Sequence, residues 1–335
     1  MPKQPGGKLA GLRDIFHGSG FNELHEGGLI IVNKWEGVFS VVPTPFHPDG
    51  RLDEESLQKA VQLFLSAGVN GLTVLGVTSE VSRLTDSEKS RIINLVLAQT
   101  AGKVPVIAGT TAEGTQTCVE ASKTAVQAGV SAVMVSPPRM PKLNSDAVIR
   151  HYQAISVAIE LPIVVQDYPP SSGYSMEASL LARIVREVPS AKVIKLEDAP
   201  TPLKIARIRE IAGDVSVSIL GGLGGMYLIE ELFAGANGAM TGFAIPEILI
   251  EVVTHFRNGS IEVAKELFYR HVALMRFEFQ EGIGLSIRKE ILRRRGVFAS
   301  AVVRAPGAGM DASTLKTLDH LLDWYKKEGC PWIPD

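Results

Sequence analysis

The segment VIKLED, residues 193–198, combines the apolar residues of a covered strand with two charged side chains in alternate positions, Lys195 and Glu197, followed by Asp198. Ile194 and Leu196 are residues that a covered β-strand favours, whereas Lys195 and Glu197 are not. Side chains of a strand alternate between its two faces, so Lys195 and Glu197 point to one side and Ile194 and Leu196 to the other. The segment therefore predicts a strand that directs a lysine and a carboxylate into the same interior.

Segments of the same kind flank VIKLED and alternate with longer amphipathic stretches. The eight strand candidates span residues 38–46, 71–76, 104–110, 132–138, 162–168, 192–197, 215–222 and 238–244. Their starts lie 23 to 33 residues apart, close to the roughly 30 residues of a βαβ unit. This repeat predicts an α/β fold, a (β/α)8 TIM barrel. A doubly wound sheet is the alternative, and the lack of a G-x-G-x-x-G motif before the first helix weighs against it.

Helix signals separate the strands and continue beyond them. Residues 53–68 carry an apolar stripe and end at Gly68, and Thr85 with Glu88 forms a capping box. After residue 256 the pattern is purely helical, over residues 260–280, 284–296 and 311–329. We therefore expect a loosely packed extension (1–35), a barrel (36–256) and a C-terminal helical appendage (257–335). The run Arg293–Arg295 is interpreted as a helix C-terminus before Gly296.

Composition excludes several classes of function. The 335 residues carry a net charge of -2, which gives no electrostatic footprint for nucleic acid or an anionic membrane surface. No apolar run approaches the ~20 residues needed to span a bilayer, and the start lacks the apolar core of a secretory signal. Cys118 and Cys330 are far apart, so a reducing cytoplasm is expected. The seven histidines lack metal-ligand spacing, so no metal is expected, and no G-x-S-x-G motif supports a Ser-His-Asp triad.

The active site of such a barrel lies at the C-terminal ends of its strands. A desolvated lysine in the position of Lys195 can attack a carbonyl and form an imine, while the alternative is a structural ion pair with Glu197. Thr78 and Ser79 follow the second strand, where hydroxyls and free amides suit a carboxylate or simply cap a turn. The seventh strand ends in LGGLGG (220–225), where a ligand could contact the backbone.

The chain resembles the dihydrodipicolinate synthase / N-acetylneuraminate lyase family. GVFSVVPTPFHPDGRLDEESL, GLTVLGVTSEVSRLT, VPVIAGT, AGVSAVMVSPP, PIVVQDYPPSSG, VIKLED and GANGAMTG occur in that family's order and spacing, over about residues 36–310. The resemblance implies a TIM barrel with C-terminal helices, and usually a homotetramer built from dimers. It also implies class I chemistry, in which a lysine of the sixth strand, here Lys195, forms a Schiff base with pyruvate or another 2-oxo acid. No separate cofactor is then expected.

Other family roles carry over unevenly. The turn after the second strand, G-T/S-T-G-E in the family, binds the carboxylate of the 2-oxo acid. In this chain Val77 replaces the first Thr or Ser of that turn, so one hydroxyl is missing. Thr78 and the turn amides, including that of Ser79, remain. Gly221 on the seventh strand and Met240 on the eighth are the other residues expected to contact substrate.

The expected proton relay is altered. The family places a relay tyrosine in Y-N-x-P on the fifth strand, and here QDYP puts Gln166 in its place. A glutamine orients a water or hydroxyl but is not an acid or base near neutral pH. Glu197 is then the first candidate for the acid and base, with Tyr168 as a candidate that could equally be a packing residue.

Two further positions bear on the substrate. The arginine that dihydrodipicolinate synthases use for the second substrate's carboxylate falls at Ser171 or Ser172, and the tyrosine pair after the fourth strand reads Pro138 and Arg139. Gln166 and Asp167 on the fifth strand are most similar to the residues at these positions in the branch of the family that contains 2-keto-3-deoxy-L-arabonate dehydratase.

Three functions follow from these residues. The first is a Schiff-base lyase, a dehydratase or aldolase of pyruvate or a sugar-derived 2-oxo acid. The second is a 4-hydroxy-tetrahydrodipicolinate synthase, which joins pyruvate to aspartate semialdehyde, with altered auxiliary residues. The third is a barrel that binds or senses a 2-oxo acid without turnover. The expected partners are the small-molecule substrate and further copies of this chain, as a dimer or tetramer.

Overall fold

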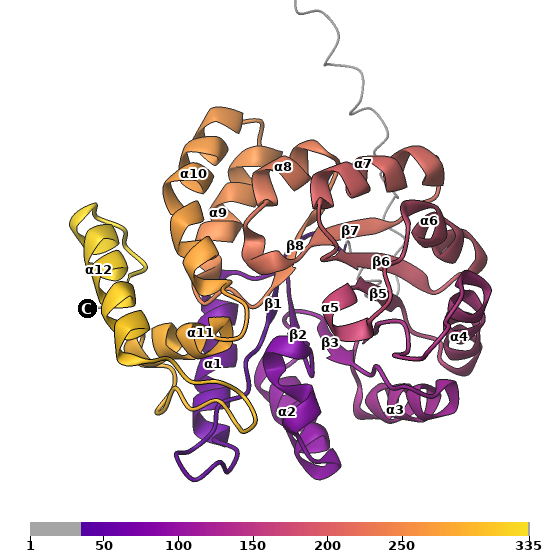
Figure 1. Cartoon of the computed structure of the whole chain (residues 1–335), viewed down its shortest axis with the longest axis horizontal. Coiled ribbons are helices and arrows are strands. Elements are labelled where there is room, and N and C mark those ends of the chain that lie inside the picture. The colour runs from indigo at the N-terminus through magenta and orange to yellow at the C-terminus, as the bar shows by residue number, and fades with distance from the viewer. Residues whose placement is uncertain (1–34, 334–335) are drawn as a thin grey trace, which may run out of the picture. The chain divides into compact units, whose positions relative to one another are not determined.

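Eight parallel strands form a closed barrel in which each strand pairs with its neighbour in sequence and β8 returns to β1 (Figure 1). The computed structural model describes residues 35–333, so the expected extension 1–35 lies, apart from Trp35, outside the described residues. The predicted TIM barrel is confirmed. Its strands are β1 (Gly37–Val41), β2 (Gly71–Val74), β3 (Val106–Gly109), β4 (Ala132–Val135), β5 (Ile163–Asp167), β6 (Ala191–Leu196), β7 (Ser218–Gly221) and β8 (Gly238–Thr241).

The strands are shorter than the sequence predicts, mainly at their C-terminal ends. β1 ends at Val41, ahead of Pro43, and β4 ends at Val135, ahead of Pro137. Proline has no N–H to donate to a neighbouring strand, so the ladder stops where the prolines begin. The apolar runs that looked like strand continue instead as loops over the mouth of the barrel, where they build the candidate site.

Helices surround the strands and cover the outer face of the barrel (Figure 1). They are α1 (Glu54–Ala67), α2 (Asp86–Thr100), α3 (Thr115–Ala128), α4 (Ser145–Ala158), α5 (Pro169–Ser172), α6 (Ala178–Glu187), α7 (Thr201–Ala212), α8 (Leu228–Phe233), α9 (Pro246–Arg257), α10 (Ile261–Glu278), α11 (Gly284–Arg294) and α12 (Ala312–Lys327). Short 3-10 turns are η1 (Val77–Ser79), η2 (Val81–Arg83) and η3 (Leu223–Gly225). In the described part of the chain no helix is long and apolar enough to cross a membrane.

The predicted helix boundary signals act as expected. Gly68 ends α1 with φ 87°, a left-handed conformation that glycine adopts without strain. Thr85 and Glu88 form the capping box of α2, each side chain bonding the other residue's backbone N–H.

Two separate cores position the site. The smaller core fills the inside of the barrel below its mouth and includes Phe39, Val193, Leu220 and Met240. The larger core packs the outer faces of the strands against the helices. Because side chains alternate along each strand, residues 195 and 197 follow Val193 on the inner face, above the apolar plug.

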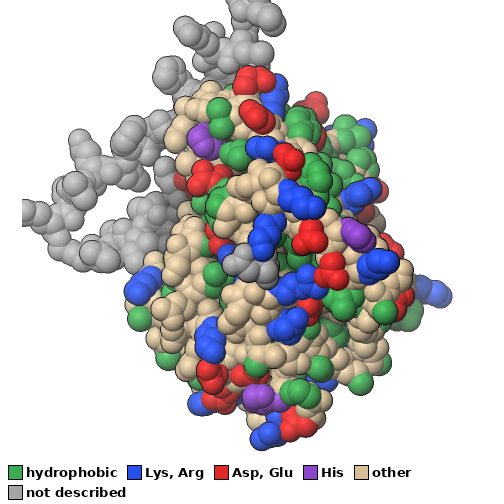
Figure 2. Space-filling model, turned by 90° about the vertical axis from the view of Figure 1, so that its left-hand side faces the viewer, with side chains coloured by type: hydrophobic (Ala, Val, Ile, Leu, Met, Phe, Trp, Pro, Cys, Tyr) green, Lys and Arg blue, Asp and Glu red, His purple; other side chains and the backbone are tan. Residues whose placement is uncertain are grey.

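The C-terminal helices pack beside the barrel, with α12 outermost next to α11 (yellow in Figure 1). Arg294 pairs with Asp319 of α12 at 2.6 Å, and Tyr325 donates to the carbonyl of Arg270 at 2.9 Å. The run Arg293–Arg295 was predicted only to complement the dipole at a helix C-terminus. It also joins two helices, because Arg295 pairs with Glu247 of α9. On the face shown in Figure 2, cationic and anionic side chains are interspersed rather than gathered by sign.

Candidate active site at the mouth of the barrel

A chain of buried polar side chains crosses the inner wall of the barrel. Lys195 Nζ lies 3.2 Å from Glu197 Oε2, and Gln166 Nε2 donates to the same carboxylate oxygen at 2.7 Å. Ser136 Oγ donates to Gln166 Oε1 at 3.1 Å. Three neighbouring strands, with the residues that follow them, thus join a lysine, a carboxylate, an amide and a hydroxyl.

Strand register explains why these residues meet. Gln166 of β5 pairs directly with Lys195 of β6, so both occupy one level of the inner face. Glu197 lies one step further along, where Gly222 leaves room for it: a Cβ on Gly222 would lie 2.3 Å from Glu197 Cγ. The structure places Lys195 and Glu197 together, as their spacing predicts, and Gln166 beside them.

A cavity of roughly 480 Å³ opens next to this chain. Gln166 and Ser136 line it, whereas Lys195 and Glu197, which contact each other beside Gln166, are not among its lining residues. Its other polar lining residues come from the segments that follow β2, β3, β4 and β5, including α2 and α5, and they are Glu80, Ser82, Arg83, Lys89, Thr111, Glu113, Arg139, Ser171 and Ser172. A ligand in the cavity would meet hydroxyl, charged and apolar side chains and would contact the amide that bonds the half-buried Glu197 carboxylate.

The turn after β2 is the second part of the site. Val77 is 47% exposed and lines the cavity. Ser79, expected among the substrate-binding residues, is buried, and its hydroxyl donates to the Val42 carbonyl at 2.7 Å. Thr44 Oγ1 donates to the Ser79 carbonyl at 2.6 Å. Ser79 therefore holds the turn against the end of β1, while Val77 and Thr78 stand at its open side.

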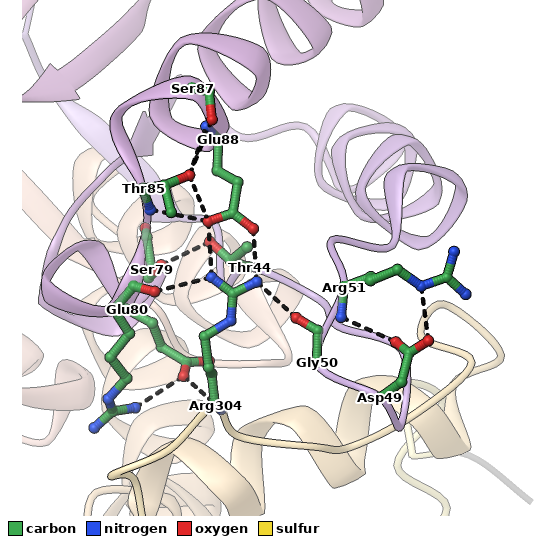
Figure 3. A network of polar contacts seen from close by, with 11 residues as sticks. Thr44, Asp49, Gly50, Arg51, Ser79, Glu80, Thr85, Ser87, Glu88 and Arg304 are labelled. Atoms are coloured by element: carbon green, nitrogen blue, oxygen red, sulfur yellow. Dashed lines mark hydrogen bonds and ion pairs between the residues drawn. The ribbon is translucent and has the colours of Figure 1, made fainter.

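Glu80 anchors this turn from behind (Figure 3). It has φ 59°, an uncommon left-handed conformation, between η1 and η2. Its buried carboxylate pairs with Lys289 of α11, with Arg83 at 2.8 Å, and accepts the backbone N–H of Arg304 at 2.9 Å. The C-terminal segment thereby fixes the turn.

Two cations around Glu80 share the ring of Phe46. Lys289 Nζ lies 4.6 Å and the Arg304 guanidinium 4.1 Å from its centroid. Burial lowers the pKa of Lys289 to about 8. Arg304 also binds Glu88 through two nitrogens, at 2.6 and 2.8 Å, and these bonds lower the pKa of Glu88 to about 2. Sequence reasoning missed this cluster, because its partners are more than 200 residues apart and no local pattern joins them.

The remaining expected residues lie at different depths. Met240 is buried in the plug inside the barrel. Tyr168 is partly buried beyond the end of β5, and burial, followed by the charge of Glu197, raises its pKa. Gly221 faces outward, because a Cβ there would lie 1.7 Å from Glu231 Oε2 of α8. On its outer side the space at Gly221 is therefore occupied by a protein carboxyl group, and contact of a ligand with its backbone stays a prediction.

Two buried carboxyl groups outside the barrel were not foreseen. Burial raises the pKa of Asp167 to about 6, although Lys204 of α7 pairs with it at 2.5 Å. Burial raises the pKa of Glu231 to about 8, and the hydroxyl of Thr201 donates to it at 2.6 Å. The outward position of Asp167 could have been predicted from the sequence, because it follows Gln166 on β5 and adjacent side chains of a strand point to opposite faces. Within residues 35–333 no three His, Cys, Asp or Glu side chains are grouped as a metal site would require.

Comparison with known proteins agrees with this geometry. The model of the Dihydrodipicolinate synthetase family matches residues 34–324. L-2-keto-3-deoxyarabonate dehydratase of Azospirillum brasilense is 34% identical over 279 residues, which cover 82% of this chain and 89% of that protein. 4-Hydroxy-tetrahydrodipicolinate synthase of Methanothrix thermoacetophila is 30% identical, with 86% and 96% covered.

Solved structures give the same result. Dihydrodipicolinate synthase from Rhodopseudomonas palustris superposes with a TM-score of 0.82 at 33% identity, and the match covers 87% of this chain and 98% of that one. The barrel, the inward lysine of its sixth strand and a match over nearly the whole described chain lead to one conclusion. The chain belongs to the dihydrodipicolinate synthetase family, whose members include lyases and dehydratases.

Proposed function

We propose that this protein is a dehydratase of a 2-keto-3-deoxy sugar acid that works through a Schiff base on Lys195. The observation that carries the proposal is the contact of Lys195 and Gln166 with the same carboxylate oxygen of Glu197, beside a cavity rich in hydroxyl groups. A polyhydroxylated tail fits such a lining better than an apolar one would. The relative from Azospirillum brasilense, 34% identical, is named for a dehydratase of this substrate class.

The chemistry follows from the positions of the groups. The neutral amine of Lys195 adds to the C2 carbonyl and water leaves, which gives a protonated imine. Glu197 removes a proton from C3, and the electron pair moves into the imine to form an enamine. The enamine then expels the C4 hydroxyl, which takes up the proton that Glu197 removed from C3 and leaves as water. Hydrolysis of the imine releases the product and restores Lys195.

Gln166 has an orienting role in this scheme. Its amide nitrogen bonds the Glu197 carboxylate at 2.7 Å and its amide oxygen accepts from Ser136 at 3.1 Å. An amide held at both ends fixes the direction in which the carboxylate acts but transfers no proton itself. The proton transfer that the family assigns to a tyrosine falls to Glu197 in this proposal.

Borohydride trapping tests the proposal. The protein is incubated with a 2-keto-3-deoxy pentonate or with pyruvate, reduced, and analysed by intact mass and peptide mapping. We expect one adduct on Lys195, and turnover of the sugar acid that the Lys195→Ala variant lacks. An adduct on another lysine would disprove the assigned nucleophile, and an adduct without turnover of any 2-oxo acid would favour a binding protein.

A second candidate is condensation of pyruvate with aspartate semialdehyde. Several relatives are named 4-hydroxy-tetrahydrodipicolinate synthase, and Arg139 lines the cavity as an exposed cation without a partner in residues 35–333. It could hold a second carboxylate in place of the arginine missing at Ser171 and Ser172. Efficient condensation that the Arg139→Met variant loses would establish this activity instead.

Self-association into a dimer or tetramer is proposed as well. A structure that superposes with a TM-score of 0.83 at 26% identity is described as a monomeric dihydrodipicolinate synthase variant, so the fold alone does not decide the matter. Mass photometry over a dilution series would give the oligomeric state directly.

A further inference from the structure

Arg288 carries a buried guanidinium that a single group, Glu278, engages among residues 35–333. It lies in α11 and is 3% exposed. Its Nε donates to Glu278 Oε1 at 2.7 Å, and Glu278 Oε2 accepts the backbone N–H of Ala244 at 3.0 Å. Glu278 is itself buried. The Glu278 carboxylate therefore links the Arg288 guanidinium to the backbone of Ala244, in the chain that follows β8.

Gly242 leaves the space into which Arg288 reaches. It follows Met240 at a distance of two residues, on the inner face of the barrel. A Cβ on Gly242 would lie 2.9 Å from Arg288 Nη1 and 3.1 Å from Thr78 Oγ1. A side chain from α11 and a hydroxyl from the turn after β2 thus approach the same point at the mouth of the barrel.

The donors around this point are unused. Within residues 35–333, Nη1 and Nη2 of Arg288 and the hydroxyl of Thr78 have no hydrogen-bond partner, and neither do the backbone N–H groups of Val77 and Thr78. Polar groups at buried or half-buried positions are normally paired. A cluster of donors with no acceptor fits an anionic ligand, and a guanidinium matches the two oxygens of a carboxylate.

We infer that Arg288, together with Thr78, binds the carboxylate of the 2-oxo acid. This inference rests on the proposed function, since it names a partner for the substrate's acid group. It also accounts for Val77: the turn lacks a hydroxyl at this position, and a charged donor from α11 replaces it. Glu278 then serves as a positioning residue that aims Arg288.

The alternative is that Arg288 and Glu278 only brace α10 and α11 against β8. The two readings differ in what the variant Arg288→Met does to ligands with and without a charge. The experiment measures the concentration of pyruvate that gives half-maximal borohydride labelling of Lys195, and the same quantity for methyl pyruvate. The ester keeps the carbonyl but carries no carboxylate.

For Arg288→Met we expect the half-saturating pyruvate concentration to rise roughly 10- to 100-fold, the scale for losing a charged hydrogen bond. The value for methyl pyruvate should change less than about twofold, because the lost interaction is with the charge. Arg288→Lys should give an intermediate value. Arg293→Met is the matched control, since Arg293 lies on the same helix and, among the described residues, pairs with Glu290 alone.

Gly242→Ala is an independent variant. The backbone of Gly242 is not in the left-handed region, so alanine is tolerated there, but its Cβ would displace Arg288 Nη1. It should raise the half-saturating concentration of pyruvate for labelling of Lys195 without raising that of methyl pyruvate. If Arg288→Met does not fold, the double variant Glu278→Gln/Arg288→Met removes the unpaired buried carboxylate and carries the same expectation.

The outcomes separate the two proposals. Suppose that pyruvate labels Lys195 of the wild type. If Arg288→Met then changes the half-saturating concentrations of pyruvate and its ester equally, or changes neither, only the role of Arg288 is overturned. A wild-type protein that pyruvate does not label at Lys195 overturns the Schiff-base function, and the role of Arg288 with it.

Discussion

Glu197 is the residue on which the proposed chemistry depends most directly. It contacts both Lys195 and Gln166, and its carboxylate is the group nearest the amine that could take a proton from C3. A second role, as the counter-ion of Lys195 at rest, follows from the same 3.2 Å contact. The two roles are separable because only one of them needs a base.

The Glu197→Gln variant separates them. Glutamine keeps the size and a hydrogen-bond acceptor but cannot remove a proton, so borohydride labelling of Lys195 should persist. Turnover of the 2-keto-3-deoxy sugar acid should fall by roughly 100-fold or more, the usual scale for losing a general base. Steady-state kinetics and intact mass give the two readouts; unchanged turnover would transfer the base to Tyr168 or a bound water.

Glu231 makes stability depend on pH. Its pKa in the folded protein is about 8, above the ordinary value of 4.5, because it is buried. Between these two values the unfolded chain loses its proton while the folded protein keeps it, so the contribution of Glu231 to stability is full below about pH 4.5 and is lost as the pH rises through 8.

The Glu231→Gln variant should remove this dependence. Glutamine still accepts from Thr201 and has no charge to bury. Its free energy of unfolding should exceed that of the wild type by an amount that grows from pH 4.5 to pH 8, on the order of 5 kcal/mol at pH 8 and above. Urea unfolding followed by circular dichroism at pH 5, 7 and 8.5 measures it. A difference that stays constant with pH would mean that Glu231 is ionised in the folded protein.

The turn after β2 depends on elements far away in the sequence. It is held by the chain that follows β1, through Ser79 and Thr44, and by α11 and the loop at Arg304, through Glu80 (Figure 3). A buried ion pair is weak evidence for stability, but removing one member leaves the other charge unpaired.

Glu80→Ala should therefore destabilise the protein by about 3–5 kcal/mol, because Lys289 loses its counter-ion in a fully buried position. Arg51→Ala, which removes the exposed pair with Asp49 at 2.7 Å, should cost less than about 1 kcal/mol. Chemical denaturation of both variants gives the comparison. Similar losses in the two would show that the Glu80 cluster is not a structural anchor.

At the scale of the whole molecule, α12 is the part that the barrel needs least. It contacts α10 and α11 through Tyr325 and Asp319 and lies away from the mouth of the barrel. Deletion of residues 311–335 exposes the partners of Leu318, Leu322 and Tyr325, at a cost of about 1.5–3 kcal/mol for each side chain.

The shortened protein should unfold at a lower temperature yet keep the wild-type half-saturating pyruvate concentration for labelling of Lys195. Thermal unfolding and the labelling titration, both on the purified variant, test the two parts. A shifted titration would show that α12 acts on the site through α11.

The sequence carries the barrel but only part of the site. Spacing of the apolar runs is local information, and it predicts eight strands and the inward pair Lys195 and Glu197. The meeting of Gln166 with Glu197 depends on strand register, which a single strand does not encode. Arg288 reaches the mouth from a helix that looks, in sequence, like any amphipathic helix. The strands end earlier than predicted, because an apolar run does not show where strand pairing stops and the prolines within such runs end the ladder.

Two consecutive glycines of the seventh strand and its exit carry a genetic consequence. Gly221 leaves room for Glu231 outside the barrel and Gly222 leaves room for Glu197 inside it. Every amino acid that one base change can produce from a glycine codon has a Cβ, so no such missense change at either codon leaves its neighbouring carboxyl group in place. This dipeptide can therefore change only after Glu197 or Glu231 has been replaced.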